Sequence, residues 1–498
     1  MELLANLQLG LAEALTLTNI LYALLGVTLG TLVGVLPGVG PSAVISILLP
    51  LTFNLGDATT SLIMLAGIFY GTQYGGSTTA ILLKIPGEIS TLVTALDGHE
   101  IARKGRAGSA LAIAALSSFF AGTVATFIVA GLAIPLTELG FKFGPAEYAN
   151  LMVLGLILSV SLTQNSFAKG LAMILTGILF GLVGTDSNTG DTRFTFDVLN
   201  LASGFSFPIV AIGVFGLSEI LYTMFHLRNN HRIIQNDLSF KEMLPTKHEF
   251  KKSAPAAVRG TFIGSLLGII PGPGTVIGSV ASYVLEKKWS KHPERFGKGE
   301  FEGLAGPEAA NNAASQTSLI PMLTLGLPFS PIPALLLGAM ILNNVVPGPM
   351  VIETNPELFW GVIAAMWISN IMLLVLNLPL IKIWIKIISI PWKILYPSIF
   401  ILTAIGSYSI SNNIFDIYSL IFFSILGYLF KVWNCEPAPF VVGFILGPFL
   451  EEYSRRALIL NSDNWAIFIN SGISQVLVGI TAIILMFKCY IFIKSLKI

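Results

Sequence analysis

The sequence predicts an all-α polytopic membrane protein with roughly a dozen transmembrane segments, arranged as two inverted repeats with broken helices or re-entrant hairpins. Three observations predict this fold class. Hydrophobic residues make up 54% of the 498 residues and charged residues 11%, against about 25% charged residues in soluble domains. Apolar stretches near the ~20 residues of a helical span recur without strand-like alternation, and backbone groups in lipid must bond within their own segment. A Gly/Pro motif inside such stretches occurs twice.

The duplication sets the domain organisation. The sequence GVLPGVGPSAVIS at 34–46 is matched by GIIPGPGTVIGS at 268–279, and YGGSTTAILLKIPGE at 74–88 is followed in the second half by NNAASQTSLIPMLTLGLP at 311–328. Pro37 and Pro271 are 271 − 37 = 234 residues apart, and Pro86 and Pro328 are 328 − 86 = 242 apart. We therefore expect a first membrane repeat at 1–224, a cytoplasmic basic linker at 225–258, and a second repeat with C-terminal helices at 259–498.

The expected spans follow in order along the chain. The first covers about 17–36, and the N-terminus before it has no basic region of the kind that precedes a cleaved signal. Two cysteines, Cys435 and Cys489, are too few and too scattered for a disulfide framework or metal site, and we expect them to pack. The further expected spans are 109–135, 148–161, 170–184, 204–224, 358–379, 391–407, 414–430, 440–450 and 467–487.

Loop charges predict the orientation. The segment 225–259 carries seven Lys and Arg against three acids, which places it in the cytoplasm by the positive-inside rule. One span earlier, 185–203 carries three Asp and only Arg193, so it is expected outside. Counting back places Arg103, Lys104 and Arg106 inside, and we also place 286–308 inside. The net charge of +1 and the lack of a basic tail indicate no nucleic-acid partner.

Four segments, 34–50, 64–86, 264–285 and 313–347, are interrupted by glycine, proline or polar residues. Each could be a broken helix or a re-entrant hairpin, and the sequence does not decide between them. Either form exposes backbone groups at membrane depth, which is tolerated where the backbone lines a cavity in the protein. Broken segments at matching places in two halves indicate the binding site of a secondary transporter.

Several long motifs also resemble a known family. These are LPGVGP at 36–41, YGTQYGGSTTAILLKIPGE at 70–88, DGHEIARKGRAGSAL at 97–111, FGKGEFEGLAGPEAANNAA at 296–314 and LIPMLTLGLP at 319–328, with LGP and a Glu at 446–451. In this order they are similar to the large membrane subunit of the tripartite tricarboxylate transporters, the TctA family. The chain departs from the family pattern at Lys84, His99, Phe329 and the SGIS sequence at 471–474.

The resemblance implies a multi-pass carrier in the bacterial inner membrane that imports tricarboxylates or related carboxylates such as citrate. It implies two partners, a small TctB-like membrane subunit and an extracytoplasmic TctC-like solute-binding protein. It also implies coupling to a cation, with Na⁺ expected and no other cofactor. The sequence does not decide between a monomer and a homodimer.

A carboxylate that enters the membrane must exchange its hydration for fixed dipoles, and a helix N-terminus offers free N–H groups and about half a positive charge. The run Gly75–Thr79 is expected to supply such an N-terminus, with hydroxyl donors beside it; the alternative is that its small residues allow close helix packing. The predicted substrate-binding residues are Gly75, Gly76, Ser77, Thr78, Thr79, Asn311, Asn312 and Ser318.

Cation coupling requires hard oxygen ligands. We expect them from backbone carbonyls freed at the two Pro-Gly motifs together with a carboxylate and an amide; the alternative for the two Asn is a helix cap. The predicted cation-binding residues are Pro37, Gly38, Gly40, Pro271, Gly272, Gly274, Glu308 and Asn312. Proton coupling is disfavoured because all five histidines fall in segments assigned to the cytoplasmic side: His99, His226, His231, His248 and His292.

Three further residues have competing explanations. Lys84 could bind an anion, pair with Glu88 four residues on, or extend to the cytoplasmic interface, and we favour the last two. Glu219 is expected to be interfacial or paired rather than to carry protons. Phe329 is expected to pack.

Two other classes of function are weighed against the carrier. An intramembrane enzyme would need a catalytic constellation, yet HEIAR at 99–103 lacks the second histidine of a zinc motif and no GxSxG elbow has a partner histidine in lipid. An organic-anion channel would show charge rings or a repeated filter. The repeat here contains two different broken segments per half, which favours a carrier.

Overall fold

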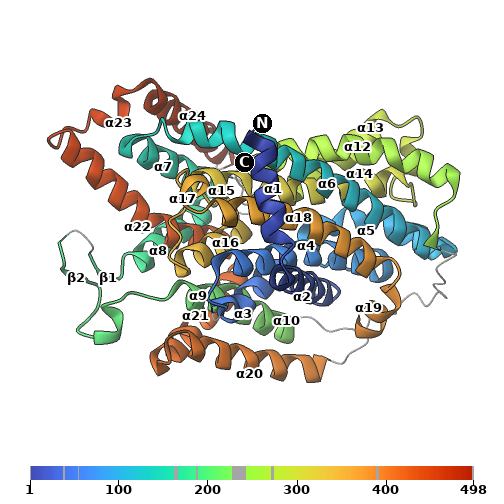
Figure 1. The fold of residues 1–498 in the computed structure, drawn as a ribbon, viewed down its shortest axis with the longest axis horizontal. Helices are drawn as coiled ribbons and strands as arrows, with labels where there is room; N and C mark the ends of the chain where they lie inside the picture. The colour runs from blue at the N-terminus through green and yellow to red at the C-terminus, as the bar shows by residue number, and fades with distance from the viewer. Residues whose placement is uncertain are drawn as a thin grey trace.

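The structure is a computed structural model that describes residues 2–36, 40–53, 55–161, 166–186, 189–226, 243–270, 274–388 and 392–495. Within these residues the chain is almost entirely helical (Figure 1), and its one β-hairpin pairs β1 (Gly184–Thr185) with β2 (Thr192–Arg193). The all-α prediction is therefore confirmed.

The described part of the first half contains ten α-helices. It also has the 3₁₀ turns η1 (Ile89–Leu92) and η3 (Leu199–Leu201) and the π-helical segments η2 (Ala102–Arg106) and η4 (Ile212–Leu217). The α-helices are α1 (Glu2–Ala14), α2 (Leu17–Gly34), α3 (Pro41–Phe53), α4 (Ala58–Leu83), α5 (Thr94–Ile101), α6 (Ala107–Gly140), α7 (Pro145–Ser161), α8 (Phe167–Gly181), α9 (Phe207–Ala211) and α10 (Ser218–His226).

The second half begins after the basic linker. Its helices are α12 (Lys247–Ile269), α13 (Gly274–Trp289), α14 (Glu302–Thr317), α15 (Ile320–Leu325), α16 (Pro331–Leu342), α17 (Val351–Thr354), α18 (Pro356–Asn377), α19 (Ile381–Ile388), α20 (Trp392–Ser411), α21 (Ile414–Val432), α22 (Pro437–Leu460), α23 (Ile467–Asn470) and α24 (Gly472–Ser495).

Five helical stretches of the described chain are long and apolar enough to cross a membrane: Leu17–Gly34, Thr94–Gly140, Phe207–His226, Pro356–Asn377 and Ile414–Val432. Shorter apolar helices such as α7, α8 and α16 accompany them. This supports a membrane protein, and the count of a dozen spans stays a prediction. The sequence reading did not include α1, an additional helix before the first expected span.

In the first half, α2 packs along α4 with their backbones in contact. A Cβ atom added to Gly26, Gly30 or Gly34 would lie 2.3 Å from the Met64 carbonyl oxygen, 2.2 Å from that of Ile68 and 2.7 Å from that of Thr72, respectively. The three contacts share one offset, 64 − 26 = 38 residues, so the two helices run parallel. Glycine at every fourth position allows this close approach, as in small-xxx-small packing between membrane helices.

In the second half, α12 packs along α14 in the same manner. A Cβ atom added to Gly260, Gly264 or Gly268 would lie 2.1 Å, 2.1 Å and 2.5 Å from the carbonyl oxygens of Gly306, Ala310 and Ala314. Gly260 follows Gly26 by 260 − 26 = 234 residues, and Gly306 follows Met64 by 306 − 64 = 242. These are the two offsets found between the Pro-Gly motifs in the sequence. Both halves thus contain the same parallel helix pair.

The four interrupted segments take different forms. In segment 264–285 the helices α12 and α13 lie against each other, because a Cβ atom on Gly274 or Gly278 would lie 3.0 Å or 3.5 Å from the Cα atoms of Gly268 and Gly264 on α12. Segment 34–50 is broken after α2, and α3 packs against α4, η4, α16 and α20. Segment 313–347 is broken into α14, α15 and α16. Segment 64–86 differs from the expectation, because α4 is continuous to Leu83 and the chain breaks only after it.

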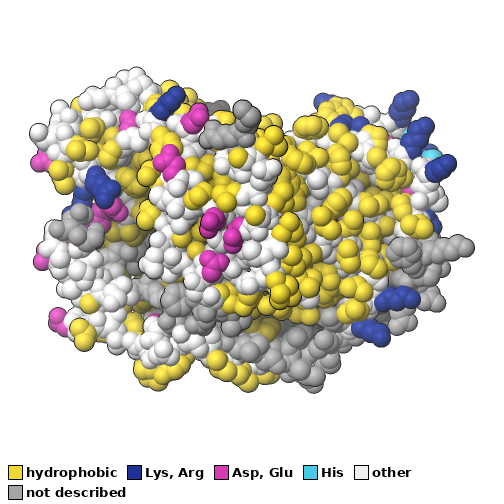
Figure 2. Space-filling view, in the orientation of Figure 1, with side chains coloured by type: hydrophobic (Ala, Val, Ile, Leu, Met, Phe, Trp, Pro, Cys, Tyr) yellow, Lys and Arg dark blue, Asp and Glu magenta, His cyan; other side chains and the backbone are white. Residues whose placement is uncertain are grey.

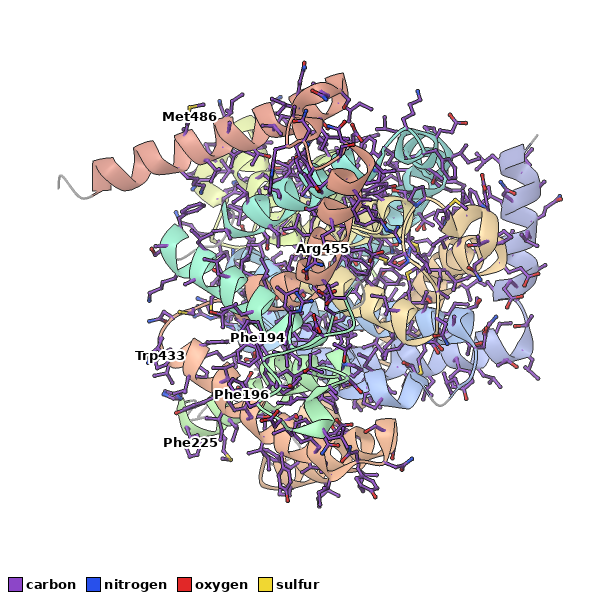
Figure 3. The ribbon with its side chains drawn as sticks, turned by 90° about the vertical axis from the view of Figure 1, so that its left-hand side faces the viewer. Phe194, Phe196, Phe225, Trp433, Arg455 and Met486 are labelled. Atoms are coloured by element: carbon purple, nitrogen blue, oxygen red, sulfur yellow. The ribbon has the colours of Figure 1, made fainter. Side chains whose placement is uncertain are left out.

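The outer surface matches a protein surrounded by lipid. Figure 2 shows hydrophobic side chains over much of the right half of this face, with Lys and Arg side chains gathered at its right-hand edge. The C-terminal helix α24 extends away from the body (Figure 3), and Met486 on its projecting part is 64% exposed. A helix of this composition exposes its apolar side chains without cost only in an apolar surrounding.

Candidate functional site

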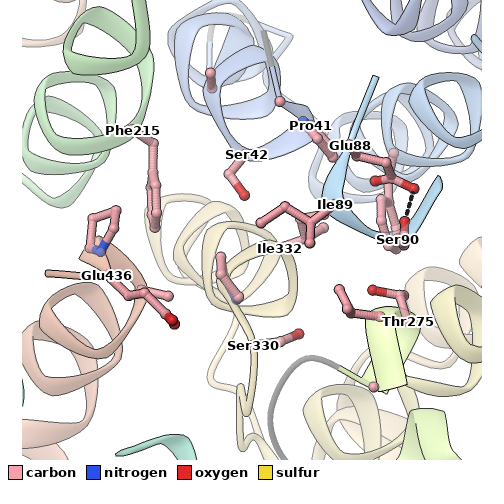
Figure 4. A pocket seen from close by; sticks show the side chains of 18 of the residues that line it. Pro41, Ser42, Glu88, Ile89, Ser90, Phe215, Thr275, Ser330, Ile332 and Glu436 are labelled. Carbon is pink, nitrogen blue, oxygen red and sulfur yellow. Dashed lines mark hydrogen bonds between the residues drawn. The ribbon is translucent and has the colours of Figure 1, made fainter. Parts of the chain in front are cut away.

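A cavity of about 660 Å³ lies where the interrupted segments of both halves meet (Figure 4). Its wall contains the first residues of α3 and α13, the loop that follows α4, and the loop that follows α15. These wall residues include Gly40–Ala43, Gly274–Val276, Pro86–Ser90, Ser318 and Phe329–Ile332. The sequence predicted that the four segments would surround a cavity, and this volume is of the size that holds a small organic ligand.

Four helices begin at the wall of this cavity. They are α3, α13, α16 and α22, whose first residues are Pro41, Gly274, Pro331 and Pro437. Proline is favoured at the first helical position because its missing N–H would have no partner there. Each N-terminus presents free N–H groups and about half a positive charge. Their convergence gives the cavity fixed dipoles oriented for an anion. One helix, α3 or α13, follows each Pro-Gly motif, and the other two, α16 and α22, come from later in the second half.

Charged side chains also line the cavity. Lys431 of α21 forms an ion pair with Glu219 of α10, and both residues are at the wall. The expectation that Glu219 is paired is confirmed. Glu436, which precedes α22, lies at the wall as well (Figure 4).

Glu88 joins the two halves of the chain at this wall. Its carboxylate accepts hydrogen bonds from Gln73 Nε2 of α4 at 3.1 Å and from Asn311 Nδ2 of α14 at 3.1 Å. Ser90 Oγ donates a third, drawn in Figure 4. Both carboxylate oxygens are therefore occupied, and Glu88 fixes the loop after α4 to α14.

A second, much smaller cavity of about 10 Å³ lies between α4, α6, α14 and α18. Glu308 of α14 is fully buried at its wall, and its carboxylate accepts hydrogen bonds from Ser77 Oγ at 2.7 Å and Ser118 Oγ at 3.3 Å. Thr94 Oγ1 donates a further bond to the same carboxylate. Asn312 Nδ2 donates to Ser118 Oγ at 2.7 Å and so belongs to the same network.

The predicted substrate-binding residues are divided between these places. Ser318 lines the large cavity, and Asn311 is bonded to its wall through Glu88. Ser77 and Thr78 line the small cavity beside Glu308. Gly75, Gly76 and Thr79 face other backbone: a Cβ atom on Gly75 would lie 2.6 Å from Thr31 O, and one on Gly87 would lie 2.4 Å from the Gly76 Cα and 3.0 Å from Thr79 Oγ1.

One local expectation is wrong, and one of the alternatives is ruled out. Gly75–Thr79 is not at a helix N-terminus, because α4 continues from Ala58 to Leu83 and these residues lie inside it. Neither Asn311 nor Asn312 caps a helix, because both lie in the interior of α14. The alternative explanation applies to Gly75: its lack of a side chain allows close packing of α4 against α2.

The predicted cation-binding residues are also separated. Gly40 and Gly274 lie at the wall of the large cavity, whereas Glu308 lines the small one and Asn312 bonds to its network. Pro37, Gly38, Pro271 and Gly272 are outside the described residues.

The remaining expectations concern single side chains. Lys84 ends α4 in the left-handed conformation (φ 58°) and lies 3.9 Å from Glu100, not beside Glu88. It is 56% exposed, which agrees with an interfacial position. Phe329 packs as expected, because a Cβ atom on Gly155 would lie 2.7 Å from its ring, although part of it also lines the large cavity.

The sequence reading missed Glu88 as a wall residue, together with Ser118, Thr94 and Asn377 around the small cavity. Asn377 had a usable signal, because a lone amide within an apolar stretch such as 371–380 marks a polar contact inside a membrane protein. Ser118 and Thr94 are small hydroxyl residues in helices and carried no such signal.

The profile of the Tripartite tricarboxylate transporter TctA family matches residues 20–442. A protein of Agrobacterium vitis named "Uncharacterized 52.8 kDa protein in TAR-I ttuC' 3'region" is 51% identical over 483 residues, which cover 96% of this chain and 95% of the relative. A second protein of that organism, named for the TAR-II ttuC' 3'region, is 54% identical over 217 residues, 44% of this chain and 90% of the relative. No solved structure matches the chain.

Proposed function

Because the chain belongs to the tripartite tricarboxylate transporter TctA family, we propose that it is a secondary active transporter subunit of the bacterial inner membrane that imports tricarboxylates or related citrate-like carboxylates. One observation carries this proposal. Four helix N-termini converge on a single cavity between the two halves of the chain, and a carboxylate is the ligand that such an arrangement favours.

The substrate binds in the large cavity. The volume of about 660 Å³ holds a small polycarboxylate with several waters. Its carboxylate groups take hydrogen bonds from the free N–H groups at the starts of α3, α13 and α16 and from hydroxyls at the wall, such as Ser42, Thr275 and Ser330.

The transport cycle alternates the access of this cavity between the two sides of the membrane. The two glycine-packed pairs, α2 with α4 and α12 with α14, are the corresponding parts of two inverted repeats. Each pair moves as a unit because its backbones are in direct contact. The loops after α4 and α15 join these units to the wall of the cavity, and their backbone conformation changes when the units move.

An extracytoplasmic TctC-like binding protein delivers the carboxylate and a small TctB-like membrane subunit completes the complex. Na⁺ drives uptake. These features come with the family and complete the proposal; an organic-anion channel is the alternative that transport measurements separate from it.

The test is uptake of radiolabelled citrate into proteoliposomes that contain this chain and its small subunit, with the binding protein outside. Uptake that depends on an inward Na⁺ gradient supports the proposal. A conductance that ignores the gradient favours a channel instead, and failure across a panel of carboxylates refutes the carrier.

The variants Ser42→Asp and Ser42→Asn test the cavity itself. Ser42 is in the first turn of α3, where an acid stabilises the helix, so Ser42→Asp is expected to fold. Its charge opposes a substrate carboxylate. At about 5 Å and an effective dielectric constant of about 20 the repulsion is about 3 kcal/mol, or more than about a hundredfold in KM. Ser42→Asn has the same shape without the charge, and should retain uptake within about fivefold. Equal uptake by the two variants would place the substrate elsewhere.

A further inference from the structure

Glu308 differs from the other carboxylates near it in its partners. Glu88 and Asp97 also have no ion pair among the described residues, but both accept N–H bonds, Glu88 from two side-chain amides and Asp97 from the backbone of the loop before α14. Glu286 pairs with Arg259, Glu300 with Lys252, and Glu249 with Arg106. Within the described residues no ion pair includes Glu308, and the hydrogen bonds that its carboxylate accepts all come from hydroxyl groups. A fully buried carboxylate without a countercharge costs several kcal/mol, so a site of this kind favours a bound cation.

A second observation at the same cavity indicates a ligand. Asn377, the last residue of α18, is 4% exposed and lines the same cavity as Glu308. Its Nδ2 atom donates to the Leu373 carbonyl oxygen at 3.0 Å, while its Oδ1 atom is buried without a hydrogen-bond partner among the described residues. A buried acceptor left in this way costs about 1–3 kcal/mol. Its partner is therefore expected to be something that enters the cavity.

The size of the cavity and its donor atoms identify the ligand's class. About 10 Å³ admits one small ion or one water. The lining side chains offer oxygens from one carboxylate, one amide and the hydroxyls of Ser77, Ser118, Thr78 and Tyr74. Hard oxygen donors suit alkali and alkaline-earth cations. The hydroxyls of Ser77 and Ser118 keep free lone pairs while they donate to Glu308. One carboxylate carries one negative charge, which a monovalent cation balances.

We propose that this cavity binds one Na⁺ ion through the Glu308 carboxylate, Asn377 Oδ1 and the hydroxyl oxygens of Ser77 and Ser118. The site is separate from Gly40 and Gly274, which line the large cavity, and it brings together one ligand each from α4, α6, α14 and α18. A bound ion joins these four helices. Its removal leaves the Glu308 carboxylate without a countercharge and Asn377 Oδ1 without a hydrogen-bond partner among the described residues.

The ion site is close to the substrate cavity along two helices. On α4, Ser77 lies one turn after Gln73, which lines the large cavity. On α14, Glu308 lies one turn before Asn311 and Asn312, and Asn311 bonds to the wall residue Glu88. The role of this ion in coupling rests on the proposed transport function, whereas the existence of the ion site does not.

The test measures binding of ²²Na⁺ to the purified chain in detergent, without carboxylate and without the other two subunits. We expect saturable binding of one ion per chain that Li⁺ displaces and an equal concentration of K⁺ does not. Glu308→Gln and Asn377→Leu should each raise the half-saturating Na⁺ concentration about tenfold or more. The matched control is Ser315→Ala on α14, whose hydroxyl donates only to Asn311 O at 2.9 Å, and it should bind as the wild type does.

A further variant keeps the test decisive where Asn377→Leu does not yield folded protein. Asn377→Asp keeps an oxygen ligand and adds a second negative charge, so Na⁺ binding should persist and Ca²⁺ should become a competitor. Unchanged Na⁺ binding in Glu308→Gln together with no Ca²⁺ competition in Asn377→Asp would overturn the proposal, as would a wild-type chain that binds protons but no ²²Na⁺. Citrate uptake without ²²Na⁺ binding at this site would refute the ion site and leave the transport function standing. Na⁺ binding without any carboxylate transport would refute the transport function and leave the ion site standing.

Discussion

Asp97 on α5 provides the sharpest stability test in the structure. Its buried carboxylate accepts backbone N–H bonds from Gly297 at 2.9 Å, Gly299 at 2.7 Å and Glu300 at 2.8 Å, and a hydroxyl bond from Tyr283 at 3.0 Å. These four donors belong to α13 and to the loop that leads into α14. Asp97 therefore attaches the first half of the chain to the helix that carries Glu308.

The change to make is Asp97→Asn, which keeps the shape and removes the charge. An amide can turn its NH₂ group toward Tyr283, whose hydroxyl accepts as well as donates, and so keep its oxygen on the three N–H groups. Each of those bonds then falls from about 1.5–3 to about 0.5–1.5 kcal/mol. The three differences of about 1 kcal/mol predict a loss of about 3 kcal/mol in the free energy of unfolding. Asp97→Ala leaves all four donors unpaired and should cost more.

The assay is unfolding of the purified protein in mixed micelles, titrated with SDS and followed by tryptophan fluorescence. Glu294→Gln serves as the control, because Glu294 lies in the same region with a 63% exposed side chain beside His292 and should leave the free energy unchanged. An Asp97→Asn protein as stable as the wild type would show that the charge at Asp97 does not hold the loop.

Two other predictions use the same assay. Gly264→Ala should abolish folding, because its Cβ atom would lie 2.1 Å from the Ala310 carbonyl oxygen. A Cβ atom at Gly131 in α6 would have no atom within 4 Å, so Gly131→Ala should stabilise the protein by about 0.5–1 kcal/mol. Equal effects of the two variants on the free energy of unfolding would argue against the close contact between α12 and α14. Burial alone would raise the pKa of Glu249, but hydrogen bonds from Arg106 and neighbouring groups lower it to about 2 from 4.5. A lowered pKa stabilises the folded state above pH 4.5, and this stabilisation is lost as the pH falls toward 2. Arg106→Gln should therefore lower the free energy of unfolding at pH 7 and match the wild-type stability in acid. A difference in stability that does not change with pH would contradict this.

The helical architecture could be predicted because its determinants are local. Apolar length sets α2, α6, α18 and α21, and the expected spans agree with them within a few residues. The breaks at the Pro-Gly motifs were also predictable, since proline lacks the N–H that a continuing helix needs. That the broken ends surround one cavity followed from the cost of exposing free backbone groups to lipid.

The position of the polar run in α4 could not be predicted in this way. Gly75–Thr79 contains the residues that often begin a helix, yet α2 lies alongside, and the close contact of Gly75 with Thr31 and Gly34 makes a continuous helix the better solution. Lys84 failed as a partner of Glu88 for a related reason. The left-handed conformation at Lys84 ends the helix, so the four-residue spacing no longer brings the two side chains together.

The ligands of the small cavity depend on tertiary contacts that no local pattern indicates. Ser77 and Glu308 are brought together across 231 residues of sequence, and Ser118 and Glu308 across 190. Each of these side chains has a bland explanation when it is considered alone. Only the packing of α4, α6, α14 and α18 against one another places the hydroxyls, the carboxylate and the amide at the wall of the same small cavity.

The repeat also bears on how many ions each chain binds. By the offset of 242 residues, Glu308 of α14 corresponds to position 308 − 242 = 66 of α4, which is the buried alanine Ala66. Ser77 corresponds in turn to Leu319. The two halves therefore share their glycine-packed scaffold but not the side chains that would hold a cation. The two halves share a backbone arrangement, but only the second half has the Glu308 carboxylate, so each chain has one such site. A measured stoichiometry of two ions per chain would require a second site built from other residues.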